Sequence, residues 1–180
     1  MKLNQISFYK DLPLLETERL ILRKLTVDDV NDYFDFASDA EVTKFLRWGP
    51  HPNKEYTTEY IQGVLNEYIN GKDGPWGLEH KIDKKIIGII HLMELDTVNQ
   101  KAQIGFVLTR SYWNNGHATE TLNRVLEYCF TNLMLNKIGA FCISENTAAI
   151  RVMEKVGMQQ EGLLSQDFSI SKDDYYTRHQ

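Results

Sequence analysis

Cysteine is scarce in this chain of 180 residues, which contains only Cys129 and Cys142. Neither lies at a spacing typical of metal ligands, and nothing in their placement suggests the disulfide framework of small secreted domains. Both lie in apolar stretches, where a reduced thiol packs as a small hydrophobic side chain. We therefore expect neither a metal site nor a structural disulfide.

Long hydrophobic runs are also missing from the sequence. No stretch approaches the roughly 20 apolar residues that a membrane-spanning helix needs. Residues 1–16, MKLNQISFYKDLPLLE, lack both the sustained apolar core and the small-residue cleavage site of a secretory signal. These absences predict a cytoplasmic protein that does not bind a membrane.

The sequence also lacks runs of basic residues, and its formal net charge is −5. A protein that binds nucleic acid or an anionic membrane usually carries a clustered positive surface, so the sequence argues against both classes of partner. A mildly acidic surface is compatible with a cationic substrate such as an amine.

The length of the chain allows one well-buried core and is too short for two comfortable domains. We expect a single domain over residues 1–180, in which residues 1–15 form a lead-in segment. No internal repeat or low-complexity segment interrupts it.

Hydrophobic periodicity predicts a mixed α/β (α+β) fold with helices on both faces of the sheet. The pattern predicts an antiparallel meander of strands in the middle of the chain. It also predicts that the helix after the meander connects two parallel strands. In order, we expect a strand over 18–25, helices beginning at 26 and over 39–46 and 57–69, strands over 76–82, 86–95 and 102–109, a helix from 118, a strand over 137–144, a helix over 146–156, and closing strands over 158–170 and from 174 to the C-terminus.

Residues 103–130 form the central unit of this pattern: a buried strand, a polar turn and an amphipathic helix. The turn, residues 110–116, ends in Gly116 at the threshold of the helix. The free N–H groups and the dipole of a helix N-terminus favour an anion such as a phosphate. The turn is neither a P-loop nor a dinucleotide fingerprint, and one glycine before a helix is more often a plain turn.

The amino-acid sequence of this unit resembles the acetyl-CoA signature of the GNAT superfamily of N-acetyltransferases, in the form found in its Rim-type (RimJ/RimL-like) branch. The matching residues are 105–108 (GFVL) and 112–121 (YWNNGHATET). Residues 17–30 and 145–158 resemble the opening and closing segments of the same branch. The sequence departs from the pattern at Asn115, where a cation is usual, and at His117, where an aromatic ring is usual.

The resemblance implies acetyl-CoA as co-substrate, bound where the two parallel strands splay apart at a bulge. Backbone groups of Phe106, Val107 and Leu108 would pair with the pantetheine arm, and Asn146 would hydrogen-bond it. Asn146 is equally suited to cap the last helix. The pyrophosphate would lie on backbone N–H groups of the turn and of the first helical residues: Asn114, Asn115, Gly116, His117, Ala118 and Thr119.

Three positions at which the family often carries an acid, a base or a hydroxyl hold other residues here. Gln103 stands where Glu is usual, Ala149 where Ser is frequent, and Met153 where many members have a Tyr acid. None of these three side chains can transfer a proton in the required way. We expect the thiolate of CoA to leave through water, because a thiol has a pKa of roughly 8.5.

Four residues of the meander are candidates for the base: Glu79, His91, Glu94 and Asp96. Each taken singly is more often a solvated residue on the face of a strand. We choose Glu94 as the catalytic base because the ends of strands line clefts.

These features predict an N-acetyltransferase that transfers the acetyl group directly to an amine in a ternary complex. The acceptor is either the α-amino group of a protein N-terminus, as in ribosomal proteins, or a small-molecule amine. The alternative is a non-catalytic CoA-binding sensor or partner-binding paralogue, which the changes at 103, 149 and 153 motivate. The resemblance alone implies a homodimer.

Overall fold

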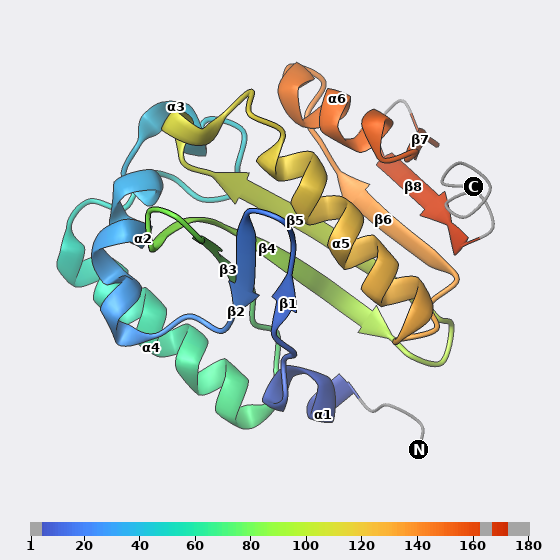
Figure 1. The fold of residues 1–180 in the computed structure, drawn as a ribbon, viewed down its shortest axis with the longest axis horizontal. Coiled ribbons are helices and arrows are strands. Elements are labelled where there is room, and N and C mark those ends of the chain that lie inside the picture. The colour runs from blue at the N-terminus through green and yellow to red at the C-terminus, as the bar shows by residue number, and fades with distance from the viewer. Residues whose placement is uncertain (1–4, 163–166, 173–180) are drawn as a thin grey trace.

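The computed structural model describes residues 5–162 and 167–172, which build an eight-stranded sheet with helices packed on it (Figure 1). The strand order across the sheet is β1-β2-β3-β4-β5-β6-β8-β7. Neighbouring strands are antiparallel except β5 and β6, which are parallel. This is the mixed sheet that the sequence predicts.

The predicted helices and strands occur in the expected order, but their first and last residues differ from the predicted ones. The strands are β1 (Leu15–Glu16), β2 (Leu20–Arg23), β3 (Trp76–His80), β4 (Lys85–Asp96), β5 (Lys101–Leu108), β6 (Lys137–Phe141), β7 (Gln159–Gln160) and β8 (Asp167–Ser171). The α-helices are α1 (Gln5–Lys10), α2 (Val30–Ala37), α3 (Ala40–Thr43), α4 (Lys54–Asn70), α5 (His117–Thr131) and α6 (Thr147–Lys155), and the 3₁₀ helices are η1 (Val27–Asp29) and η2 (Arg110–Tyr112).

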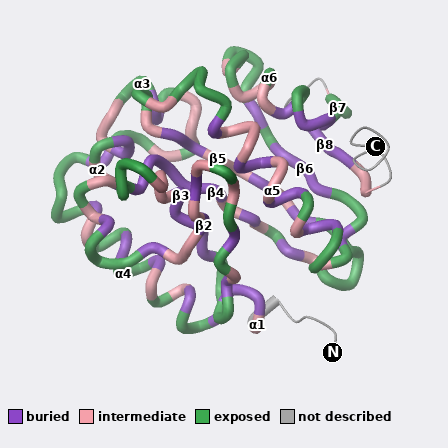
Figure 2. Tube along the Cα trace, viewed as in Figure 1, coloured by how far each residue is buried: buried purple, intermediate pink, exposed green. Residues whose placement is uncertain are grey.

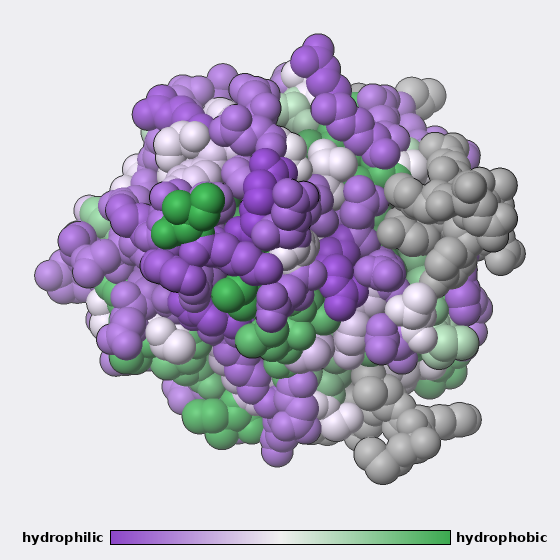
Figure 3. Space-filling view, viewed as in Figure 1, coloured by the Kyte–Doolittle hydropathy of each residue, from purple (hydrophilic) through white to green (hydrophobic). Residues whose placement is uncertain are grey.

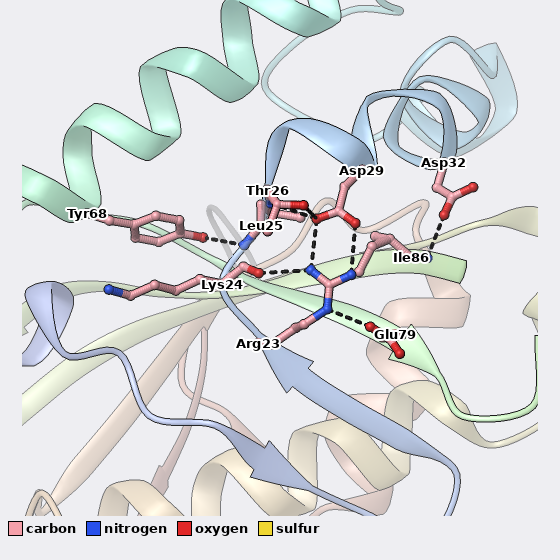
Figure 4. A network of polar contacts seen from close by, with 9 residues as sticks. All are labelled: Arg23, Lys24, Leu25, Thr26, Asp29, Asp32, Tyr68, Glu79 and Ile86. Carbon is pink, nitrogen blue, oxygen red and sulfur yellow. Dashed lines mark hydrogen bonds and ion pairs between the residues drawn. The ribbon is translucent and has the colours of Figure 1, made fainter. Parts of the chain in front are cut away.

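Both topological predictions for the middle of the chain are confirmed. Strands β3, β4 and β5 form the antiparallel meander, and α5 connects β5 to the parallel strand β6. In Figure 4, α2 and α4 lie on one side of the strands and α5 lies on the other. The apolar stripe of α5 faces the sheet and is buried: Leu122, Val125, Leu126, Cys129 and Phe130.

The N-terminal segment is more ordered than a lead-in. Residues 5–10 form α1, and Phe8 and Tyr9 on this helix are buried in the core. The ring of Phe8 packs edge-on to Trp76, with ring centroids 5.8 Å apart. A helix of six residues makes fewer than two turns, so it gives too little periodicity to be recognised in the sequence.

Strand β4 extends beyond the start of its neighbour β3, whose pairing begins at Trp76 opposite Ile90. The backbone of β4 after Ile90 therefore has no partner strand on that side among the described residues. The hydroxyl of Tyr9 donates to the carbonyl oxygen of Leu92 at 2.7 Å. Helix α1 thus covers the edge that β3 leaves open.

Helix α4 begins three residues before the predicted start at Thr57. Asn53 is its N-cap, and its side-chain oxygen accepts a hydrogen bond from the N–H of Tyr56 at 2.8 Å. Gly71 ends the helix with a φ of 66°, a backbone conformation that glycine adopts without strain. The C-terminal end of α4 is predicted well from the sequence, because a single glycine determines where the helix stops.

The C-terminal strands are shorter than expected. The predicted strand over 158–170 is two strands, β7 and β8, which pair with each other, and β8 also pairs with β6. Strand β6 itself ends at Phe141, three residues before the predicted end. The strand predicted from 174 to the C-terminus lies outside the described residues.

Buried residues concentrate on the strands and on the inner sides of the helices, as Figure 2 shows. On the face seen in Figure 3, hydrophilic residues dominate and hydrophobic ones form small separate patches. Within residues 5–162 and 167–172, no helix is both long and apolar enough to span a membrane.

A network of charges joins the first part of the chain to the sheet (Figure 4). The guanidinium group of Arg23 forms two hydrogen bonds with the carboxylate of Asp29, at 2.8 and 2.9 Å, and one with Glu79 at 2.6 Å. Asp29 also accepts from the backbone N–H of Thr26 at 2.7 Å, as part of a capping box between Thr26 and Asp29 at the start of η1. Asp29 and Glu79 raise the pKa of Arg23, and burial lowers it. The effect of the two carboxylates is the larger, so the pKa of Arg23 lies above its ordinary value.

Candidate functional site

The parallel strands β5 and β6 separate along their length. They pair only from Lys101 opposite Lys137 to Gln103 opposite Gly139. Beyond that point β5 continues to Leu108 without a partner on this side among the described residues, and the two strands diverge in Figure 1. The gap that the resemblance implies is therefore present.

A register break lies beside the point of separation, on the strand next to the parallel pair. Strand β5 pairs with β4 in continuous register from Gln103 to Leu108, across the point where β5 leaves β6. The break lies instead between Met93 and Asp96 of β4, where Glu94 has a φ of 51°. The bulge thus lies on the neighbouring strand β4, directly beyond the pair Met93–Gln103, and Gln103 is the last residue of β5 that pairs with β6.

Backbone groups on one edge of β5 face the gap. Thr109 N donates to Ile87 O at 2.7 Å, and hydrogen-bonding groups alternate along an antiparallel strand. Phe106 and Leu108 therefore turn their N–H and C=O groups toward the gap, whereas those of Val107 face β4. The carbonyl of Leu108 accepts a hydrogen bond from Trp113 Nε1 at 2.8 Å, which closes the turn over the end of the strand.

The turn after β5 places several N–H groups at the start of α5. Asn114 and Gly116 have positive φ values of 59° and 81°. The first amide of this helix with a helical partner is that of Glu120, which donates to Gly116 O at 3.0 Å. The amides of the first helical turn consequently have no helical acceptor, and together they form a concave set of donors suited to an anion.

Arg19 of the β1–β2 hairpin holds this turn in place, a role that the sequence analysis does not identify. Its Nη1 donates to Asn115 O at 2.8 Å, and its Nε donates to the carboxylate of Glu120 at 2.6 Å. Burial works against the charge of Glu120, but hydrogen bonds from Thr17 and Arg19 hold its pKa below the usual value. No periodic signal marks Arg19, because its partners lie about a hundred residues away.

The side chain of His117 turns into the protein rather than toward solvent. It is 5% exposed and packs edge-on to His80 and Tyr112, at centroid distances of 5.3 and 5.8 Å. Burial and the positive charge of Arg19 lower its pKa. The ring fills the place in which the related pattern carries an aromatic side chain, and the backbone N–H of His117 stays at the helix start.

One face of the sheet opens where β5 leaves β6. Facing pairs on β4 and β5 lie side by side on this face. The pair Ile89–Val107 is buried, whereas the next two, His91–Gly105 and Met93–Gln103, are only partly buried. Solvent thus reaches the sheet beside the gap at these two pairs.

Gln103 lies at the point of separation. Its side chain covers Gly139, where an added Cβ would come within 2.7 Å of the amide oxygen. That oxygen, Oε1, is buried and has no hydrogen-bond partner among the described residues. A buried amide oxygen without a partner costs free energy, so this position is suited to receive a donor from a ligand.

The structure separates the candidate bases. Glu79 is bound to Arg23, and the carboxylate of Asp96 accepts from the amides of Val98 and Asn99, which lower its pKa. Glu94 is exposed, and it has no ion pair or hydrogen bond with the described residues. His91 is half-buried on the open face of the sheet.

The closing segment of the family pattern forms α6. Asn146 caps it, since its Oδ1 accepts from Ala149 N at 3.2 Å, which leaves the side-chain NH₂ group for another acceptor. Met153, at the place of the usual tyrosine acid, is 2% exposed and belongs to the core. Its thioether has no proton to donate, so this position supplies no acid for the leaving group.

Three comparisons bear on this arrangement. The model of the acetyltransferase (GNAT) domain family matches residues 19–159. The chain is 35% identical to the uncharacterized N-acetyltransferase YoaA of Bacillus subtilis (strain 168) over 154 residues, which cover 86% of this chain and 87% of YoaA.

Solved structures share the fold. An acetyltransferase of the GNAT family from Bacillus anthracis has a TM-score of 0.78 and 25% sequence identity, covering 89% of this chain and 99% of its own. A spermidine N-acetyltransferase from Vibrio cholerae, solved in complex with CoA and spermine, has a TM-score of 0.73 and 21% identity, covering 88% of this chain and 98% of its own.

Proposed function

Since the chain belongs to the acetyltransferase (GNAT) family and is an acyltransferase, we propose that it transfers the acetyl group of acetyl-CoA directly to a primary amine. We further propose that it follows the Rim-type branch, on the strength of residues 17–30 and 112–121. The alternative of a non-catalytic CoA-binding protein is disfavoured by the family.

One arrangement carries the proposal: the gap between β5 and β6 leads to the N–H donors of residues 114–119. The diphosphate of acetyl-CoA would lie on these donors, where the α5 dipole also favours negative charge. The pantetheine arm would pair with the gap-facing backbone groups of Phe106, with the N–H of Leu108 and with the amide of Asn146. The thioester would then lie near Gln103, at the point of separation.

The chemistry requires little more than positioning and the removal of one proton. The neutral amine forms a C–N bond with the acetyl carbon, the C–S bond breaks, and CoA leaves as a thiolate. Because neither Met153 nor Ala149 has an ionisable proton, water protonates the thiolate. The acceptor is a protein N-terminal α-amino group or a small amine such as a polyamine, the class to which the spermine of the Vibrio cholerae structure belongs.

The first experiment measures release of CoA thiol from acetyl-CoA with a panel of spermidine, other small amines and short N-terminal peptides. Calorimetry with acetyl-CoA on the same sample measures binding. We expect acetyl-CoA to bind and one acceptor class to drive thiol release. Binding with no release by any amine or peptide would contradict the proposed transfer, and an absence of binding would contradict the cofactor site.

Glu94 is the residue that we propose to meet the acceptor, because its exposed carboxylate at the end of β4 can attract an ammonium group. The variant Glu94→Gln is expected to raise KM for the acceptor about 2- to 5-fold, the size of an exposed ion pair. Steady-state kinetics with the best acceptor measure this change. An unchanged KM at low ionic strength would exclude the contact, and the Kd for acetyl-CoA serves as the control.

A further inference from the structure

The proposed transfer needs a group that takes the proton from the acceptor's ammonium form. The amide of Gln103 cannot accept it, and the carboxylates of Glu79 and Asp96 are engaged within the fold. Glu94, predicted from the sequence as the base, is exposed at the end of β4, where we assign it to contact with the acceptor instead. We propose that His91 is the general base of this reaction and that Asp73 positions its ring. The inference rests on the proposed function and assigns the proton transfer within it.

The first argument is location. His91 pairs across the strands with Gly105, and the next pair on the same face is Met93–Gln103. Both pairs are partly exposed, directly beside the point where β5 leaves β6. His91 and Gly105 face each other on neighbouring strands, and Cε of Met93 lies 3.1 Å from where a Cβ of Gly105 would be, so the imidazole and Met93 together border this part of the strand along which the thioester would lie. An amine approaching the thioester on this face would therefore approach His91.

The second argument is the orientation of the ring. Nε2 of His91 is buried, has no hydrogen-bond partner among the described residues, and lies 3.9 Å from Oδ1 of Asp73. A nearby carboxylate favours the tautomer with the proton on Nε2, which leaves Nδ1 with the lone pair. The side chain is 26% exposed, so the ring is reachable from the opening.

The third argument is charge. Burial lowers the pKa of His91, and the carboxylate of Asp73 partly opposes this effect. The ring is therefore neutral near pH 7 and able to accept a proton, and Asp73 stabilises the imidazolium that forms. Tyr9 of α1 lies near the same carboxylate, and burial together with Asp73 raises the pKa of its hydroxyl well above the ordinary value, so it stays neutral.

The proton balance is simple. Nδ1 of His91 takes one proton from the ammonium group, and the freed nitrogen lone pair attacks the acetyl carbon. The electron pair of the broken C–S bond leaves with the thiolate of CoA. The imidazolium then returns its proton to water, and no oxidant or further reactant is needed.

The test compares His91→Ala, Asp73→Asn and Glu94→Gln across pH, with the acceptor identified by the thiol-release panel. For His91→Ala we expect kcat/KM to fall about 100-fold or more, the usual contribution of a general base, with the Kd for acetyl-CoA unchanged. In the parent, activity should rise with pH through the pKa of His91. This limb should be lost in His91→Ala, and added imidazole should restore part of the rate.

Asp73→Asn gives a second readout, independent of the loss of activity. Removing the carboxylate takes away the influence that raises the pKa of His91, so the acid limb should move to lower pH. A purely structural role for Asp73 would not shift this limb. Thermal unfolding of each variant tests its folding, and His91→Gln replaces His91→Ala if the latter does not fold.

Three outcomes would overturn the proposal. The first is a folded His91 variant with kcat/KM within about 3-fold of the parent, far below the effect of a general base. The second is loss of the acid limb in Glu94→Gln but not in the His91 variant, which would make Glu94 the base. The third is an acid limb unmoved by Asp73→Asn. Failure of the proposed function differs from all three, because the parent itself would then bind no acetyl-CoA or release no thiol.

Discussion

The variant Gly116→Val is expected to weaken acetyl-CoA binding about 100-fold, because it deforms the set of N–H donors at the start of α5. Gly116 has a φ of 81°, a conformation in which a β-branched residue is strongly strained. The backbone would relax toward negative φ and turn the amides of residues 114–119 away from the diphosphate. Calorimetry with acetyl-CoA measures the change directly.

Gly63 provides a matched control, because it is a glycine inside α4 whose added Cβ would meet no atom within 4 Å. Gly63→Ala should leave binding unchanged and stabilise the protein by about 0.5–1 kcal/mol, the difference in helix propensity. If Gly116→Val is folded and binds acetyl-CoA within about 5-fold of the parent, corresponding to less than 1 kcal/mol, the donors of this turn do not hold the diphosphate.

The variant Arg23→Met should lower the free energy of unfolding by about 3 kcal/mol, since it leaves two carboxylates without their cation. Asp29 is only 5% exposed, and Glu79 lies on the neighbouring strand under the same guanidinium group. Urea denaturation measures the loss. This expected loss of about 3 kcal/mol is at the low end of the range for breaking a buried ion pair, because the side chain of Arg23 is partly exposed.

Arg124→Met is the control for this variant, because Arg124 pairs with the exposed Glu127 of α5 and also donates to the carbonyl oxygen of Glu16 at 3.1 Å. Its expected cost is below about 1 kcal/mol, typical of an ion pair near the surface. The double variant Arg23→Met/Asp29→Asn should recover part of the loss, because it removes the unpaired charge. Equal stability of Arg23→Met and Arg124→Met would show that the network of Figure 4 does not hold α2 to the sheet.

Much of the fold can be predicted from the sequence, because most helices and strands follow from patterns in short stretches of neighbouring residues. The unit of β5, the turn and α5 combines a buried apolar run, one glycine and a stripe of period 3.6, and each part is found where expected. Helix α1 and the early start of α4 escape prediction for a different reason. One is too short to show a period, and the other depends on the side-chain cap of Asn53.

The site is less predictable, because its decisive features join distant parts of the chain. The resemblance implies a gap between β5 and β6 and a bulge at the separation, but it does not indicate that the bulge lies on β4. Arg19 reaches the turn, and Asp73 reaches His91, only through the folded sheet. The resemblance implies that backbone groups of Val107 pair with the pantetheine arm, but these groups face β4. The roles of Glu94, Phe106, Leu108, Asn146 and residues 114–119 stay predictions until binding and kinetics are measured.

The contact between Tyr9 and Leu92 has a consequence for how the protein is handled. It covers a strand edge that would otherwise offer free backbone groups to another polypeptide. A shortened chain that begins after residue 10 would present this edge to a second copy and invite intermolecular strand pairing and precipitation. Fusion partners and purification tags therefore belong where they leave the packing of Phe8 and Tyr9 undisturbed.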